Sequence, residues 1–158
     1  MKINLTLNRD LFLDKYYPLL EDYSHKVELY MGGSASGKSF FICQKLILRA
    51  LKQKIRILVC RKYLSTIKDS CFSLFKQIIE QWGLTPYVDI VESNYRIIFK
   101  HNGSEIIFKG LDEETKLLSL NEIGTVFVEE AFEIDKNMLD QLILRMRAPI
   151  KDSQIIMA

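Results

Sequence analysis

The sequence predicts an α/β fold in which a mainly parallel sheet is flanked by helices. Short apolar runs alternate with longer helical patterns, an order typical of such sheets. A glycine-rich run, Gly32 to Ser39, joins the first predicted strand to the first predicted helix. No repeat or linker divides the 158 residues, so we expect one domain, residues 1–158. Because ligands of parallel sheets bind beyond the carboxyl ends of strands, the chemistry is expected near Gly32, Arg61 and Glu129.

A strand-helix-strand unit comes first. The apolar runs Val27 to Met31 and Ile55 to Cys60 suit strands that are buried on both faces. A helix after Lys38 lies between them, with apolar residues at helical spacing: Phe40, Cys43, Ile47, Ala50 and Leu51. Basic residues fall between these apolar positions and are expected to form a solvated helix face: Lys45, Arg49 and Lys52.

A second helix and a hairpin follow. Leu64 to Trp82 carries the clearest helical periodicity of the chain, and Gly83 supplies a natural C-terminal stop. The runs Arg96 to Lys100 and Glu105 to Lys109 flank a four-residue segment that contains Asn102-Gly103. Because Asn-Gly readily takes the positive φ angles of a tight turn, these runs predict a β-hairpin, inserted into the parallel sheet.

The last part of the chain predicts strand, helix and strand again. Thr125 to Glu129 is a buried strand by its apolar composition. Asp135 is placed to cap a helix that runs to about Arg147, before Pro149. The pattern of Gln154 to Ala158 predicts one more strand.

Composition excludes several classes of protein. The net charge of +2 gives no polyelectrolyte character, and no apolar stretch is long enough to span a bilayer. Three cysteines without C-x-x-C spacing argue against a disulfide framework or a zinc site, and two distant histidines argue against a His-based centre. We therefore expect a soluble intracellular protein from a reducing compartment.

The run Gly32-Gly33-Ser34-Ala35-Ser36-Gly37-Lys38-Ser39 matches the phosphate-binding pattern G-x-x-x-x-G-K-[ST], in the strand-to-helix context that the pattern requires. Its glycines allow backbone N–H groups to turn inward as an anion nest, and the following helix presents its positive end to the same phosphates. Lys38 would bridge the β- and γ-phosphates of ATP, and the Ser39 hydroxyl would bind Mg²⁺.

The segment Thr125 to Glu130 has the form of a Walker B strand, an apolar run that ends in two adjacent acids. Successive side chains at a strand end point in different directions, so the two carboxylates can serve different purposes. Glu129 would hold Mg²⁺ through its water shell, and Glu130 would polarise the attacking water. A second carboxylate beside the metal favours hydrolysis over transfer of phosphate to an acceptor.

Further short segments lie around the phosphate loop and the Walker B strand. In chain order they are Tyr16-Tyr17-Pro18, Gly32-Gly33, Cys60-Arg61-Lys62, Lys68-Asp69-Ser70, Phe108-Lys109-Gly110-Leu111-Asp112, Glu129-Glu130-Ala131 and Leu144-Arg145-Met146-Arg147. Each piece is unspecific alone. In this order and spacing, and through almost the entire chain, they resemble the large terminase subunits of tailed bacteriophages, the ATP-driven motors that package DNA into procapsids.

The resemblance implies a P-loop NTPase fold, with an extra strand between the phosphate-loop strand and the Walker B strand. It places the segment Tyr16-Tyr17-Pro18, and Tyr17 in particular, near the adenine, although a small apolar cluster at the sheet edge is an equal alternative. Arg61 would reach the nucleotide or a neighbouring subunit. Arg145 and Arg147 are also candidates, but the helix dipole favours cations at that end of a helix in any case.

Two departures from the family pattern affect the expected activity. Many terminases carry an arginine at the position of Ser34, and serine supplies no positive charge. The chain also ends at Ala158, about where the family's coupling motif would begin, so we expect a truncated ATPase domain without the C-terminal nuclease domain. Weak ATPase activity and a mainly monomeric state are expected of such a chain.

The resemblance also implies partners. They are double-stranded DNA, a portal protein, a small terminase subunit and further copies of the chain in a ring, all in the host bacterial cytoplasm and none in a membrane. The basic run Lys38 to Lys68 is one candidate DNA surface, with a solvated helix face as the alternative. Two other functions stay open: another P-loop ATPase, such as a helicase, a loader or a kinase, and a nucleotide-binding assembly module without turnover in isolation.

Overall fold

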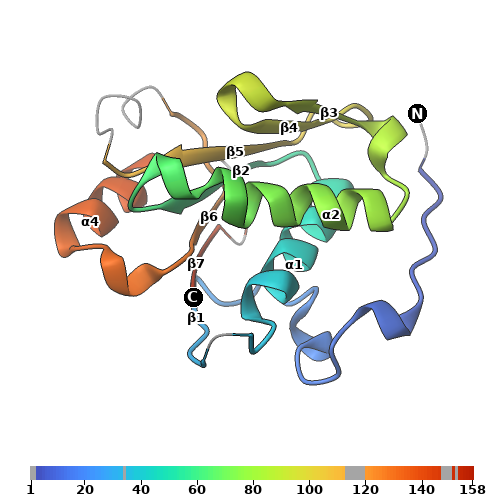
Figure 1. Cartoon of the computed structure of the whole chain (residues 1–158), viewed down its shortest axis with the longest axis horizontal. Coiled ribbons are helices and arrows are strands. Elements are labelled where there is room, and N and C mark those ends of the chain that lie inside the picture. Colours follow the sequence, from blue (N-terminus) through green and yellow to red (C-terminus); the bar gives the residue numbers. More distant parts are fainter. Residues whose placement is uncertain (1–2, 34, 113–119, 147–150, 152) are drawn as a thin grey trace.

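One seven-stranded sheet, in the order β1-β7-β6-β2-β5-β4-β3, forms the centre of the computed structural model (Figure 1). The structure describes residues 3–33, 35–112, 120–146, 151 and 153–158. The strands are β1 Val27–Leu29, β2 Arg56–Arg61, β3 Val88–Val91, β4 Arg96–Phe99, β5 Glu105–Gly110, β6 Thr125–Val128 and β7 Gln154–Met157. Strands β1, β7, β6, β2 and β5 run parallel to one another. At the end of the sheet, β4 pairs antiparallel with β5, and β3 pairs antiparallel with β4. The predicted α/β class is confirmed.

Helices cover both faces of the sheet, as predicted. Helix α1, Lys38–Lys52, and helix α2, Ser73–Gln81, pack together on one face, and helix α4, Lys136–Arg145, lies on the other (Figure 1). Successive side chains of β2 point to opposite faces of the sheet. Ile57 and Val59 pack in the core beneath α1 and α2, whereas Leu58 and Cys60 pack in the core that includes Leu142 of α4. The side chain of Asp135 caps α4 by accepting from the backbone N–H of Met138, as expected.

The predicted helix from Leu64 to Trp82 is not continuous. A 3₁₀ turn, Leu64–Thr66, leads into a π-helical turn, Lys68–Phe72, and only then does α2 begin. In the wide turn the N–H of Phe72 donates to the carbonyl of Ile67, five residues earlier. The hydroxyl of Ser70 donates to the carbonyl of Thr66 at 2.7 Å, which gives that turn a local alternative to regular α-helical bonding. Periodicity alone does not distinguish these geometries.

The predicted hairpin is present, but its turn is wider than expected. Of the pair Asn102-Gly103, only Gly103 takes a positive φ, of 72°. Asn102 instead uses its side-chain amide, which donates to the carbonyl of Ala50 and accepts from the N–H of Ser104. The turn thereby binds a carbonyl at the end of α1, where helix carbonyls lack intrahelical partners. The second hairpin strand, β5, lies beside β2 in the parallel part of the sheet.

Two burial expectations were wrong. β1 is an edge strand of the described sheet, and Val27 and Leu29 are 58% and 59% exposed rather than buried. Lys45 and Arg49 are buried rather than solvated, because α1 is covered on nearly every side. Lys45 forms an ion pair of 2.8 Å with Glu28 of β1. The Arg49 guanidinium donates to Thr125 of β6 and to Gln154 of β7.

All three cysteines are buried and free. Within the described ranges, no cluster of three or more His, Cys, Asp or Glu side chains is suited to hold a metal ion. None of the described helices combines the length and the apolar character needed to cross a membrane.

Candidate functional site

The phosphate loop connects β1 to α1, and its described backbone has the expected left-handed turns. Ala35 has a φ of 60°, and Gly37, the N-cap of α1, has a φ of 81°. No side chain caps this helix end, so the backbone N–H groups of its first turn stay available to a ligand. A Cβ atom added to Gly37 would clash with Cδ1 at the end of the flexible Leu13 side chain, so the left-handed φ is the main reason for glycine there. Ser34 lies outside the described residues.

Lys38 folds back over the loop from the first turn of α1. Its Nζ donates to the carbonyls of Gly32 at 2.8 Å and Gly33 at 3.2 Å, and to the hydroxyl of Ser36 at 3.3 Å. In the part of the chain that the structure describes, Lys38 forms no ion pair with a carboxylate. A cation held among neutral acceptors at a loop of this shape suits a phosphate ligand.

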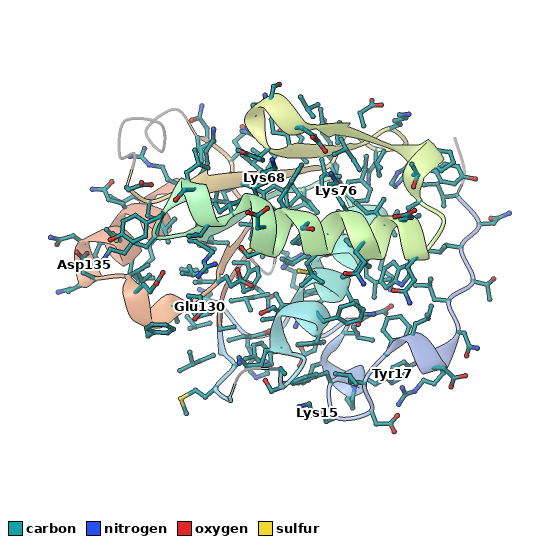
Figure 2. The ribbon with its side chains drawn as sticks, in the orientation of Figure 1. Lys15, Tyr17, Lys68, Lys76, Glu130 and Asp135 are labelled. Carbon is teal, nitrogen blue, oxygen red and sulfur yellow. The ribbon has the colours of Figure 1, made fainter. Side chains whose placement is uncertain are left out.

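The N-terminal segment packs against the loop from outside. Lys15 donates to the carbonyl of Ser36 at 2.7 Å, and the ring of Tyr16 stacks on that of Phe41 of α1 with centroids 4.5 Å apart. Neither Leu13 nor Lys15 was identified from the sequence, because nothing local links them to a loop more than twenty residues away. Figure 2 shows Lys15 at the lower edge of the molecule.

Tyr17 packs against other residues of the N-terminal segment. The Arg9 guanidinium lies 3.7 Å from the centroid of its ring, and Phe12 meets it edge-on. Tyr17 and Pro18 line a hollow of about 420 Å³ together with apolar residues that include Leu48 of α1. Of the two tyrosines, Tyr16 is the one beside Gly37, since its Cε2 atom lies 4.0 Å from the added Cβ position.

The Walker B segment ends beside β2, as the sequence reasoning required. β6 stops at Val128, and the N–H of Glu129 donates to the carbonyl of Cys60 of β2. Only 9% of Glu129 is exposed. Its Oε2 accepts a hydrogen bond from the thiol of Cys71 at 2.8 Å and lies 3.8 Å from Nε of Arg61. Two of the predicted residues, Arg61 and Glu129, are therefore brought together.

Two buried thiols have pKa values that respond to this carboxylate. Burial raises the pKa of Cys71 well above its ordinary value, and the negative charge of Glu129 raises it further. For Cys43 of α1 the same two causes raise the pKa in the same order, so its thiol also lies within the field of Glu129. Both thiols therefore stay protonated, and Cys71 acts as a donor. The sequence pattern indicated only a core position for Cys71 on a helix face, with no sign of this contact.

Glu130 differs from Glu129 in backbone and environment. It has a left-handed backbone, with φ 55° and ψ 50°, which is uncommon for a residue with a side chain. It is half-buried, and the 3₁₀ turn Ala131–Glu133 follows it directly. Figure 2 shows Glu130 between α4 and the part of the sheet that carries β1. The sharp change of chain direction separates the two neighbouring acids, as two different chemical roles require.

The candidate arginines near the C-terminal helix are only partly described. Arg145 lies in the last turn of α4 and donates to Gln141 at 3.4 Å. Its backbone carbonyl accepts from the N–H of Ile123, ahead of β6. Arg147 lies outside the described residues. Arg61 is thus the described candidate arginine that contacts a predicted site carboxylate.

The oxygen ligands among the described residues suit a Mg²⁺ ion that is bound by the protein and by nucleotide phosphates together. Mg²⁺ prefers oxygen ligands and is commonly bound by one or two carboxylates together with substrate phosphates. Ser39, in the first turn of α1, and Glu129, after β6, would supply a hydroxyl and a carboxylate, and the loop between β1 and α1 would hold the phosphates.

Comparison of sequences relates the chain to longer phage proteins. A family profile described as phage terminase large subunit matches residues 24–158. The PBSX phage terminase large subunit of Bacillus subtilis (strain 168) is 38% identical over 136 residues, which make up 84% of this chain and 31% of that protein. The chain therefore spans about a third of the length of this relative.

Comparison of structures gives the same fold. The large terminase of bacteriophage HK97 has a TM-score of 0.74 and 14% identity, and the match covers 97% of this chain and 33% of that one. The large terminase of a thermophilic bacteriophage in complex with ATP-gamma-S has a TM-score of 0.63 and 11% identity, covering 83% of this chain and 31% of that one. At these identities the likeness establishes the fold alone, which this chain shares with about a third of each large terminase.

Proposed function

The chain belongs to the family of phage terminase large subunits, and from this premise we propose that it binds Mg²⁺-ATP at Gly32–Ser39 and hydrolyses it to drive DNA packaging. One observation carries the proposal: Lys38 lies over a loop whose left-handed turn at Gly37 opens directly into the uncapped N-terminus of α1. This arrangement supports an anionic ligand with several phosphates. The complex of the thermophilic phage terminase with ATP-gamma-S supports the choice of a nucleotide.

Each residue of the site has a distinct proposed role. The backbone N–H groups of the loop bind the phosphates, and Lys38 exchanges its loop carbonyls for the β- and γ-phosphate oxygens. Ser39 and Glu129 hold Mg²⁺, Glu129 through the metal's water shell. Bound magnesium neutralises the charge that develops on the phosphates. Arg61, 3.8 Å from Glu129, orients that carboxylate or reaches the nucleotide when it binds.

Glu130 is the proposed general base. It lies one residue beyond Glu129 and is half-exposed, so a water molecule has access to it. In the proposed step Glu130 accepts a proton from the attacking water, whose oxygen forms a bond to the γ-phosphorus as the bond to the ADP leaving group breaks. A kinase has no need of a carboxylate that activates water. Its presence favours hydrolysis over transfer to an acceptor.

The wider activity is a proposal about a longer protein. We place residues 1–158 in its ATPase domain, because the matched relative extends well beyond the aligned region. The partners would be double-stranded DNA, a portal protein, a small terminase subunit and other copies of the same subunit in a ring. Arg61, Arg145, Arg147 or an arginine from a neighbouring copy would supply the cation that Ser34 lacks.

Lys38→Ala tests the nucleotide site. We expect this variant to lose ATP binding in calorimetry while its unfolding transition stays near that of the wild type, because the half-buried lysine contributes little to the core. Lys100→Ala is the matched control, since Lys100 is an exposed lysine in the hairpin turn. Equal ATP affinity in the wild type and Lys38→Ala would contradict the proposed site.

A further inference from the structure

A buried thiol contacts the candidate magnesium carboxylate. Sγ of Cys71 donates to Oε2 of Glu129 at 2.8 Å, across 58 residues of sequence. Cys71 is fully buried and Glu129 is nearly so, which keeps water from replacing this hydrogen bond. Hydrogen bonds to ionised acceptors are stronger than those between neutral groups, more so where the dielectric is low. The contact therefore restrains the carboxylate.

Local structure explains why the thiol reaches the end of β6. Cys71 lies within the π-helical turn Lys68–Phe72, ahead of α2. Because a π turn holds one more residue than an α-helical turn, the side chains after it point in other directions around the helix axis than regular α-helical spacing would give. Phe72 then contacts Phe108 of β5, with ring centroids 5.1 Å apart, while the side chain of Cys71 meets Glu129. Such π-turns within helices often occur at functional sites.

The same carboxylate carries a second restraint. Nε of Arg61 lies 3.8 Å from the same Oε2 atom that accepts the thiol hydrogen bond. At 3.8 Å this is an ion pair rather than a direct hydrogen bond. The Glu129 side chain is thus held by one neutral donor from the segment before α2 and by one charge from β2. Of these two contacts, the short bond from the thiol is the one that fixes a direction.

We propose that Cys71 is a positioning residue, whose thiol holds the Glu129 carboxylate in the orientation required for magnesium bound with the nucleotide. The inference rests on the proposed function of Glu129. Residues that orient a ligand of a metal commonly change metal affinity or activity about 10- to 100-fold when they are removed. Cys71 needs no contact with ATP itself, so its effect should be confined to the magnesium-dependent part of binding.

The experiment compares cysteine variants in ATP binding by calorimetry, with a series of MgCl₂ concentrations and with EDTA. Cys71→Ala removes the donor, and Cys71→Ser restores one. Cys60→Ala is the matched control, because Cys60 is equally buried but donates to the backbone carbonyl of Phe127 at 3.4 Å and not to Glu129. We expect the magnesium concentration for half-maximal binding to rise about 10-fold in Cys71→Ala and to stay unchanged in Cys60→Ala.

The serine variant separates positioning from packing. A buried serine is less apolar than cysteine or alanine, so a role in packing alone predicts that Cys71→Ser is no better than Cys71→Ala. A role as donor predicts that serine recovers part of the magnesium response, and ATP affinity in EDTA should be the same in all variants. Equal magnesium responses in Cys71→Ala and Cys60→Ala would overturn the inference. Failure of the wild type itself to bind Mg²⁺-ATP would instead overturn the proposed function.

Discussion

Gly37 shows how one residue shapes the candidate site. Its φ of 81° turns the chain from the loop into α1, and the space where a Cβ would stand is occupied by Leu13. Glycine suits this position first for its backbone conformation, and second because a side chain there would displace the end of Leu13. The motif indicates the first requirement, and only the packing of the N-terminal segment creates the second.

Gly37→Ala is expected to weaken ATP binding and to reduce the free energy of unfolding by about 1 kcal/mol or more, since alanine is strained at positive φ and its methyl group displaces Leu13. Chemical denaturation and calorimetry measure the two effects. Gly33→Ala is the matched control for the stability measurement, because a Cβ there meets nothing within 4 Å apart from its chain neighbours. Wild-type stability in Gly37→Ala would contradict the packing argument.

The two acids after β6 lead to a prediction about turnover. Glu130→Gln keeps the size of the side chain and removes its negative charge, so it should retain ATP binding while hydrolysis falls about 10²- to 10⁴-fold, the usual contribution of a general base. Single-turnover hydrolysis with labelled ATP measures this step. Glu133→Gln, in the 3₁₀ turn that follows Glu130, is the control. Normal hydrolysis by Glu130→Gln would mean that another group serves as the base.

At the scale of elements, a buried ion pair joins α1 to β1. Lys45 has no exposed side-chain surface, and the Glu28 side chain is 10% exposed. Burial lowers the pKa of Lys45, while the hydrogen bond and the charge of Glu28 act in the opposite direction. Gln154 of β7 also donates to Glu28. The position of the first strand relative to the helix therefore depends on polar contacts as well as on apolar packing.

Glu28→Gln is expected to lower the free energy of unfolding by about 3 kcal/mol, because it leaves a buried ammonium without its counter-charge. Urea denaturation measures the change. The double variant Glu28→Gln with Lys45→Met should recover much of the loss, since it removes both charges. Glu92→Gln, which breaks the exposed pair with Lys76, should change stability far less. If Glu28→Gln and Glu92→Gln lowered the free energy of unfolding equally, the buried pair would stabilise the fold no more than the exposed pair does.

At the scale of the whole molecule, the expected ATPase activity is weak. An arginine finger can accelerate phosphoryl transfer about 10³- to 10⁵-fold, and serine at position 34 supplies no such charge. We expect turnover to rise with protein concentration if a neighbouring copy donates the arginine, and to rise in Ser34→Arg at any concentration. Fast hydrolysis that is independent of concentration in the wild type would contradict the idea of a missing cation.

Comparison of turnover in the presence of candidate acceptors tests the alternative functions. Transfer of the γ-phosphate to an acceptor would favour a kinase, and ATP binding without turnover at any concentration would favour an assembly module. Hydrolysis by water alone is the outcome expected of a packaging motor. Double-stranded DNA added to the same assay should raise turnover if DNA is a partner.

Much of the fold and part of the candidate site could be predicted from the sequence, because their signals are local. The phosphate-loop pattern needs only eight neighbouring residues, Gly32 to Ser39, and apolar periodicity located α1 and the strands β2 and β6 within one or two residues. The adjacent acids Glu129 and Glu130 were likewise visible at a strand end. β3, a short strand with mixed polarity, carried too weak a pattern and was not predicted.

The chain by itself determined the kind of fold, the phosphate loop and the family, since these depend on residue types at short spacing. Tertiary structure alone decided which distant groups meet. Placing β6 beside β2 brings Arg61 to Glu129, the π-turn brings Cys71 to the same carboxylate, and the crowded position of α1 turns Lys45 into a buried charge. The physical reason is that such contacts join residues tens of positions apart, where packing of whole elements, and not local spacing, fixes the distance.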